Sequence, residues 1–331
     1  MNKYRHRIMG VAAAIGLAVT AAGCAGSPAP APIDDSSATA ELTDVRVAIM
    51  PLSGLAPFFL ALDNGYFEEE GLRLETEMAA GGAAVIPALI AGDYDIGIGN
   101  AFNYMNAAGS GLDLQIITHI YSVTSGTQYD GIFTMPDSGI KTPADLVGKT
   151  IAINTIHSVS DFQIVAEMES LGFDRDDYQF VEMPFPDMPA ALEQGHVDAA
   201  MMAEPFFTQV QEQIGATPVL SSPDRFSSIP DMANLPFGVF SATGGFIAEN
   251  PEIVSAFQRA FDRARDEVIK DPQLGLDAFL NHSDMDPSLA SKLSWPNFER
   301  AQVADFERML RLMDEVGYLE GDLDVNDVLA F

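Results

Sequence analysis

The chain has 331 residues, which is long enough for two domains of ordinary size. Hydrophobic residues make up 47% of it and charged residues 20%, so an intrinsically disordered chain is excluded and a sizeable core is expected. With 17 Lys and Arg against 48 Asp and Glu, the formal net charge is −31. Such a surface repels phosphate backbones, and we expect no nucleic-acid partner.

The N-terminus has the order of an export signal. Lys3, Arg5 and Arg7 precede the uncharged stretch 8–22. As a helix this stretch would span about 22 Å, which is short of the roughly 30 Å bilayer core. It therefore predicts a signal peptide over 1–23 rather than a membrane span.

Cys24 is the only cysteine of the chain. An intramolecular disulfide and a cysteine-ligated metal site are excluded. The run Ala21-Ala22-Gly23-Cys24 resembles a bacterial lipobox, which implies that Cys24 carries a lipid and becomes the mature N-terminus. The alternative is an ordinary secretory signal cut at a neighbouring small residue. The Ala-, Pro- and Ser-rich segment 24–43 then predicts a lipid-anchored flexible tether on an extracytoplasmic domain.

From Val45 onward, short apolar segments typical of strands alternate with helical ones. Helices are predicted over 57–65, with Pro57 in the first turn, and over 83–91 and 101–108. Strands are predicted over 45–49, 72–77, 94–99 and 114–121. This alternation favours an α/β fold with a mainly parallel sheet.

The second half repeats the pattern and then becomes helical. Ser160 and Gln163 have the spacing of a capping box. The acidic tail after Gly317 is expected to pack loosely. Strands are predicted over 150–154, 178–183, 197–203, 217–220 and 237–242, and helices from 142 and over 160–171, 188–194, 204–214, 250–269, 272–281, 287–293 and 298–316.

An internal repeat connects the two halves. The pattern A-L-x-x-G-x-x-D occurs at 88–95 and again at 191–198, an offset of 103 residues. In each copy a helix ends at glycine and a turn leads into a buried strand. We interpret this as two similar α/β lobes, against the alternative of chance similarity in an Ala-rich chain.

Five motifs in order resemble one family. The first is Gly65-Tyr66-Phe67-Glu68-Glu69-Glu70-Gly71-Leu72, and both copies of the repeat, 140–149 and Glu204-Pro205 follow. Together they cover about 45–245. They are similar to the extracytoplasmic solute-binding proteins of ABC importers, of the nitrate/sulfonate/taurine and thiamine-pyrimidine-precursor type.

The resemblance implies an α/β fold of the type II periplasmic-binding class, in which two lobes close over a ligand. We expect the two chain crossings near 122–130 and 238–244. Lobe 1 is then 44–124 plus 243–331, and lobe 2 is 129–239. Closure would be a hinge motion that favours the ligand-bound state.

Ligands of open α/β sheets bind beyond the carboxyl ends of the strands, and this rule selects four loops. Several of these loops lead into helices, whose free N–H groups suit oxygen-rich ligands. The candidate ligand-binding residues are Ser53, Gly54, Leu55, Phe58, Asn100, Ala101, Phe102, Asn154, His157, Ser158, Ser160 and Glu204.

Each candidate has a structural alternative. Ser160 and Glu204 would then only cap their helices, and Asn100 would satisfy backbone groups at the end of its strand. His157 would be a solvated loop residue. The aromatic candidates would belong to the core: Phe58, Phe102, Tyr104 and Phe206. The riskiest hypothesis is that Asn100 and Glu204 face one another and both contact the ligand.

None of the four loops contains Arg or Lys, which favours a neutral or amine-bearing heteroaromatic ligand over a sulfonate, taurine or nitrate. The resemblance implies ABC permease and ATPase subunits as partners, and we expect a monomer with no cofactor, metal or catalytic residue. The rivals are a signalling or scaffold module and an enzyme. The related eukaryotic pyrimidine-precursor synthases carry a cysteine-rich motif and metal-binding histidines, which are not found here.

Overall fold

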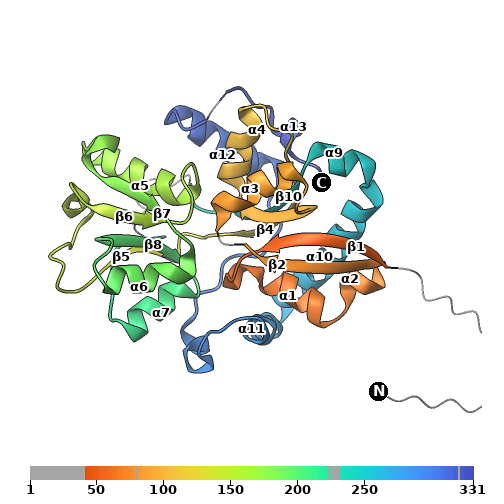
Figure 1. Cartoon of the computed structure of the whole chain (residues 1–331), viewed down its shortest axis with the longest axis horizontal. Helices are drawn as coiled ribbons and strands as arrows, with labels where there is room; N and C mark the ends of the chain where they lie inside the picture. The colour runs from red at the N-terminus through yellow and green to blue at the C-terminus, as the bar shows by residue number, and fades with distance from the viewer. Residues whose placement is uncertain (1–41, 80, 223, 225–231, 320) are drawn as a thin grey trace, which may run out of the picture. The chain divides into compact units, whose positions relative to one another are not determined.

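The computed structural model describes residues 42–331, except 80, 223, 225–231 and 320. For Ala83 it describes the backbone and not the side chain. The expected signal peptide, Cys24 and nearly all of the tether lie outside the described residues. Two five-stranded sheets form the framework (Figure 1). The first has the order β2-β1-β3-β10-β4 and the second the order β7-β6-β8-β5-β9. The predicted α/β class with two α/β lobes is confirmed.

The strands of the first sheet are β1 (Thr43–Ile49), β2 (Leu72–Met78), β3 (Ile96–Asn100), β4 (Gln115–Ser122) and β10 (Pro236–Ala242). Those of the second are β5 (Asp130–Thr134), β6 (Thr150–Ile153), β7 (Gln179–Glu182), β8 (Ala199–Ala203) and β9 (Thr217–Ser221). The sequence prediction missed β5, a short buried strand that begins with Asp and Gly.

The helices of the first half are η1 (Ser53–Leu55), α1 (Ala56–Asp63), α2 (Tyr66–Glu69), α3 (Gly82–Ala91), α4 (Ala101–Gly109), η2 (Pro143–Leu146) and α5 (Val159–Ser170). Those of the second are η3 (Arg175–Asp177), η4 (Phe185–Asp187), α6 (Met188–Glu193), α7 (Phe206–Gln213), α9 (Gly244–Glu249), α10 (Pro251–Lys270), α11 (Pro272–Asn281), η6 (Pro287–Lys292), α12 (Val303–Glu315) and α13 (Val325–Val328).

The repeated sequence pattern has the same structural role in both sheets. Asp95 accepts a hydrogen bond from the backbone N–H of Arg46 at 2.8 Å, and Asp198 accepts one from that of Thr150 at 2.9 Å. Each aspartate thus anchors the turn before β3 or β8 to the neighbouring strand, β1 or β6. β3 and β8 then pair in parallel with these strands, so the two sheets are built on one plan.

Each sheet is mixed rather than mainly parallel, which corrects the prediction. β1 pairs in parallel with β2 and β3, whereas β10 runs antiparallel to β3 and β4. In the second sheet β5 has the position that β10 has in the first, and it runs antiparallel to β8 and β9. The chain passes directly from the first sheet into β5 of the second, and from the second sheet into β10 of the first. Each of these two strands therefore runs opposite to its neighbours.

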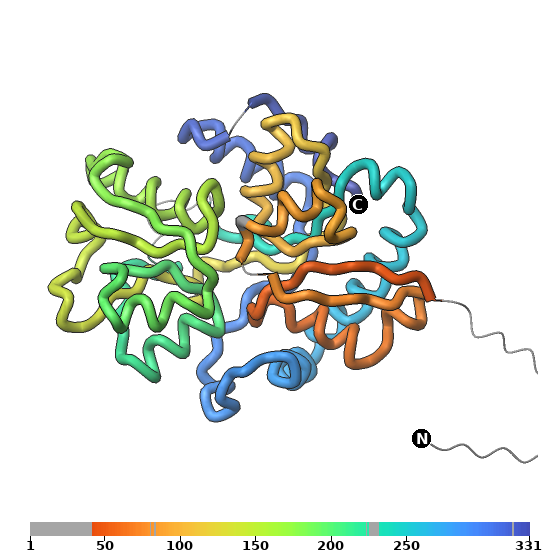
Figure 2. The backbone as a smooth tube through the Cα atoms, in the orientation of Figure 1, coloured from red at the N-terminus to blue at the C-terminus, as the bar shows by residue number. Residues whose placement is uncertain are grey.

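The chain leaves the first sheet after Ser122 and enters the second at Asp130. It leaves the second after Ser221 and has returned to the first at Pro236. The passage from Ser122 to Asp130 can be followed along the backbone in Figure 2. The second crossing therefore precedes β10, and the expected position at 238–244 is wrong. All seven residues of β10 are buried, and this apolar run looked like the last strand of the lobe that precedes it.

Two other predictions need correction. The capping box of α5 is formed by Ser158 and Asp161, not by Ser160 and Gln163. The Asp161 carboxylate accepts from the backbone N–H groups of His157 and Ser158 together, whereas a neutral glutamine lacks this charge-assisted strength. The tail after Gly317 is also not loose, because Val325 and Val328 are buried and Leu329 bridges to β4.

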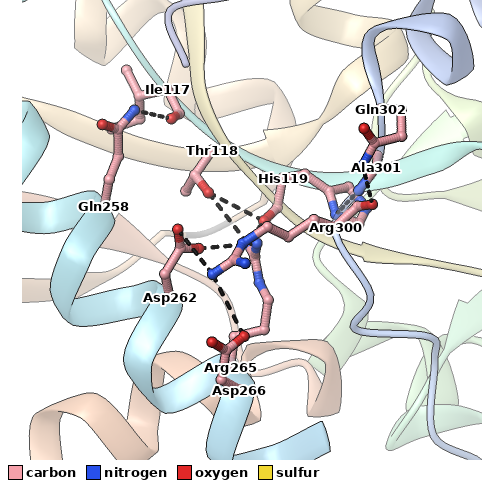
Figure 3. Close-up of polar contacts among 10 residues, drawn as sticks. All are labelled: Ile117, Thr118, His119, Gln258, Asp262, Arg265, Asp266, Arg300, Ala301 and Gln302. Atoms are coloured by element: carbon pink, nitrogen blue, oxygen red, sulfur yellow. Dashed lines mark hydrogen bonds and ion pairs between the residues drawn. The ribbon is translucent and has the colours of Figure 1, made fainter.

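A buried polar network connects α10 to β4 (Figure 3). Arg265, 1% exposed, donates to Thr118 Oγ1 at 3.2 Å and to the carbonyl of His119, and forms an ion pair with Asp262 at 3.0 Å. His119 Nδ1 accepts from the backbone N–H of Ala301 at 3.3 Å. Burial, together with the nearby guanidinium, lowers the pKa of His119 to about 3, so this imidazole is neutral at physiological pH.

Candidate functional site

A cavity lies where the strand ends of both sheets meet, and we call it the central cavity. Its volume is about 60 Å³, several times the volume that a single water needs. Residues that follow β1, β3 and β6 contribute to its wall, and β8 contributes the last residues of the strand itself, Met201–Ala203. The lining residues are Met50, Leu52, Gly82, Ile86, Ile98, Gly99, Asn100, Asn103, Tyr104, Tyr121, Tyr129, Asp130, Asn154, Thr155, Ser158, Val159, Ser160, Phe185, Met201, Met202, Ala203 and Phe237.

The second sheet contributes the end of β6 and the first turn of α5. Asn154 is 8% exposed, and its Oδ1 accepts from Thr155 Oγ1 at 3.1 Å. Ser158 caps α5: its hydroxyl accepts from the N–H of Ser160 at 3.1 Å and donates to the carbonyl of Thr155 at 2.7 Å. Ser158 is therefore engaged in holding the loop. Ser160 lies inside the helix rather than at its cap, and it is one of the residues that line the cavity.

The first sheet contributes the end of β3 and the first turn of α4. Asn100 caps α4, because its Oδ1 accepts from the backbone N–H of Phe102 at 3.0 Å. It also lines the cavity, so the structural and the functional interpretations both apply. One turn further, Asn103 Nδ2 donates to the carbonyl of Ile156 at 3.3 Å. This bond connects the α4 end of the cavity to the loop after β6.

The sequence prediction missed the tyrosines that form one side of the cavity. Tyr121 and Tyr129 flank the first crossing, and their ring centroids are 5.2 Å apart. The Tyr129 hydroxyl accepts from the backbone N–H of Gly54 at 3.2 Å. A Cβ at Gly54 would lie 2.5 Å from the Tyr121 ring, so glycine is required where the chain passes this pair. Burial raises the pKa of both phenols, that of Tyr121 to about 12, so both remain protonated donors.

Glu204 does not line the central cavity, although Asn100 does. Its side chain is fully buried and accepts from the N–H of Thr208 at 3.1 Å, the hydroxyl of Thr208 at 2.8 Å and the N–H of Ser294 at 3.1 Å. Glu204 is thus a cap on α7 that also holds the segment around Ser294. Burial raises the pKa of this carboxyl to about 7, and the three hydrogen bonds oppose that rise. The structure therefore does not bring Asn100 and Glu204 together in the wall of the central cavity.

Most of the remaining candidates belong to the core. Phe58 is fully buried and packs against Phe67, Phe240 and Phe257 with centroid distances of 5.3–6.3 Å. The other core residues among the candidates are Leu55, Ala101 and Phe102, each fully buried.

Ser53 and His157 have structural roles. Ser53 is fully buried, and its N–H donates to the carbonyl of Glu204 at 3.2 Å. His157 has a φ of 57° and is exposed; its N–H donates to Asp161 and its ring packs 5.9 Å from that of Tyr318. It lies on the rim of a groove next to the central cavity, not in its wall.

The charges around the cavity are few. None of the described lining residues is Lys, Arg or His, and Asp130 is the single acidic one among them. Asp130 is buried and takes part in mutual hydrogen bonds with Ser222. Over the described part of the chain, no group of three or more His, Cys, Asp or Glu side chains is placed to hold a metal ion. Nor does any helix in that part have the length and apolarity to cross a membrane.

Known sequences and structures share this architecture. The chain is 27% identical over 263 residues to 4-amino-5-hydroxymethyl-2-methylpyrimidine phosphate synthase of Aspergillus parasiticus, covering 77% of this chain and 74% of that one. It is 23% identical over 214 residues to the taurine-binding periplasmic protein of Escherichia coli, covering 65% and 63%.

Among solved structures, the alkanesulfonate-binding protein of Xanthomonas axonopodis pv. citri bound to MOPS matches with a TM-score of 0.72. The sequence identity is 16%, and the match covers 88% of this chain and 99% of that one. This similarity confirms the periplasmic-binding-protein fold. The model of the NMT1/THI5-like family matches residues 53–274. The chain therefore belongs to the NMT1/THI5-like family, and the predicted relationship to solute-binding proteins is confirmed.

Proposed function

We propose that this protein is the solute-binding component of an ABC importer, which captures one small molecule in the central cavity and delivers it to a membrane permease. The observation that carries the proposal is the shared wall of the cavity. Asn100 and Asn103 come from the first sheet, and Asn154 and Ser160 come from the second. A ligand bound by both sets would hold the two sheets together, which is how a hinge-closing binding protein retains its solute.

The ligand class that we propose is a neutral or amine-bearing heteroaromatic compound of the pyrimidine type. The described lining offers no cation to a sulfonate or nitrate, whereas Asp130 favours an amino group over an anion. Phe185 and Phe237 add aromatic faces that suit a planar ring. A sulfonate, taurine or nitrate is the alternative, and it would rely on the N–H groups and hydroxyls at the starts of α4 and α5.

Thermal unfolding and calorimetric titration with four probes test this proposal. The probes are 4-amino-5-hydroxymethyl-2-methylpyrimidine, taurine, nitrate and MOPS. A probe at 100 times its Kd adds about 2.7 kcal/mol to the free energy of unfolding, which is easily measured as a rise in Tm. We expect the pyrimidine alone to stabilise the protein. Stabilisation by taurine, nitrate or MOPS instead would support the transport role and overturn the pyrimidine assignment.

A synthase role is the second candidate, because a relative 27% identical to this chain is named as a pyrimidine phosphate synthase. We propose binding rather than synthesis, since the cysteine-rich motif expected of the eukaryotic synthases has no counterpart in a chain whose only cysteine is Cys24. Release of a pyrimidine phosphate by the purified protein, detected by mass spectrometry, would contradict this. A sensor or scaffold role would be favoured if no ABC permease and ATPase genes adjoin its own.

A further inference from the structure

The side-chain amide of Asn154 makes two hydrogen bonds with one atom and none with the other. Its Oδ1 accepts from the backbone N–H of Gly82 at 3.1 Å and from Thr155 Oγ1 at 3.1 Å. Its Nδ2 is buried and has no hydrogen-bond partner among the described residues. Because a backbone N–H can only donate, the bond from Gly82 assigns the oxygen and leaves the NH₂ group as the unpaired end.

The partner Gly82 belongs to the other sheet's half of the molecule. It is the first residue of α3, which connects β2 to β3, whereas Asn154 follows β6. A Cβ at Gly82 would lie 2.6 Å from Thr155 Oγ1 and 3.0 Å from Asn154 Oδ1. Only glycine therefore allows the start of α3 to approach the loop after β6 this closely.

This contact lies where the central cavity adjoins a neighbouring groove. Gly82, Ile86, Asn103 and Thr155 line both the cavity and the neighbouring groove, which has a volume of about 350 Å³. The bond between Asn103 and the carbonyl of Ile156 spans the same boundary. The wall between cavity and groove is thus made by contacts between the two halves of the molecule.

We propose that Asn154 couples ligand binding to closure of the two lobes. In the closed form the N–H of Gly82 holds Oδ1, and this orients Nδ2 as a fixed donor to an acceptor atom of the ligand. When the lobes separate, the amide loses this partner and is free to rotate, so the donor is no longer preorganised. The inference rests on the proposed binding function and adds a requirement: the ligand presents a hydrogen-bond acceptor, such as a ring nitrogen, to Nδ2.

Two substitutions at Asn154 separate its two roles. Asn154→Asp keeps an acceptor for the N–H of Gly82 and removes the donor, whereas Asn154→Leu removes both and keeps the number of side-chain heavy atoms and the branching at Cγ. Gly82→Ala blocks the close approach from the other side. Its matched control is Gly245→Ala in α9, where a Cβ would meet its nearest neighbour at an ordinary 3.7 Å.

The first measurement is hydrogen exchange of the Gly82 amide in the purified protein without a probe. We expect exchange roughly 2- to 10-fold faster in Asn154→Leu, and close to the wild-type rate in Asn154→Asp and Gly245→Ala. Exchange in Asn154→Leu at the wild-type rate would overturn the closure contact. This measurement needs no ligand, so it remains decisive even if the proposed function fails.

The second measurement is calorimetric titration with 4-amino-5-hydroxymethyl-2-methylpyrimidine, taurine and nitrate. Asn154→Asp and Asn154→Leu should each lower the affinity for the probe that binds the wild type by roughly 5- to 150-fold. Gly245→Ala should leave this affinity unchanged. Gly82→Ala should lower the affinity for the probe as well, although this substitution leaves the Nδ2 of Asn154 in place. Wild-type affinity in Asn154→Asp would overturn the donor role. If no probe binds the wild type, the proposed ligands are wrong, and the exchange measurement alone decides the contact.

Discussion

Replacement of Glu204 by glutamine tests the assignment of this residue as a buried cap. The carboxyl has a pKa of about 7 in the folded protein against 4.5 in an unperturbed setting. Because the folded pKa is raised, the group's stabilising contribution is fully present below pH 4.5 and is lost as the pH rises through 7. Between pH 5 and pH 8, this amounts to a loss of about 2–3 kcal/mol from the free energy of unfolding.

Glutamine does not titrate, so the variant should lack this pH dependence. At pH 5, where the wild-type carboxyl group is protonated, we expect Glu204→Gln to cost about 1–3 kcal/mol, because the NH₂ group of glutamine cannot accept from a backbone N–H that a carboxyl oxygen accepts from. At pH 8 the difference in the free energy of unfolding should shift by about 2–3 kcal/mol in favour of the variant. The affinity for any bound probe should stay unchanged, since Glu204 does not line the cavity.

Urea unfolding of both proteins at pH 5 and pH 8 measures the effect. Glu249→Gln is the control, because Glu249 is exposed and its replacement should change the stability little at either pH. An equal difference between Glu204→Gln and the wild type at the two pH values would refute the buried-carboxyl argument. A loss of probe binding with unchanged stability would return Glu204 to the ligand site.

Three further predictions concern the core, the buried network and the N-terminus. His119 has a depressed pKa of about 3, so its contribution is present above its ordinary pKa of 6.5 and is lost on acidification. From pH 7 to pH 5 the wild type should lose about 2 kcal/mol more than His119→Asn in urea unfolding, and parallel curves would contradict this. Phe58→Ala should cost about 3–5 kcal/mol while sparing probe affinity; the reverse pattern would make Phe58 a ligand contact. Cys24→Ser should release the protein from the membrane fraction of the expressing bacterium, and firm retention would argue against the lipid anchor.

The sequence alone was sufficient for the fold class and for the repeat. Alternating apolar segments identified nine of the ten strands in the described part of the chain, because a buried strand needs a local apolar run that is visible without tertiary contacts. The repeated aspartates, Asp95 and Asp198, pointed to two equivalent turns, and they make equivalent bonds to β1 and β6. Residues from three of the four predicted loops, those after β1, β3 and β6, line the central cavity, since the strand-end rule depends on topology and not on side chains.

Only the tertiary structure decided which residues of those loops contact the cavity. Glu204 and Asn154 both follow a buried strand, but the donors around Glu204 include Ser294, 90 residues away, and they hold its buried carboxyl group against α7 and the segment around Ser294. Asn154 is held by Gly82, 72 residues away, at the edge of the cavity. The second crossing was misplaced for the same reason: the apolar sequence of β10 fits either sheet, and only its antiparallel pairing with β3 and β4 places it in the first. Such choices depend on partners distant in sequence, which local patterns do not encode.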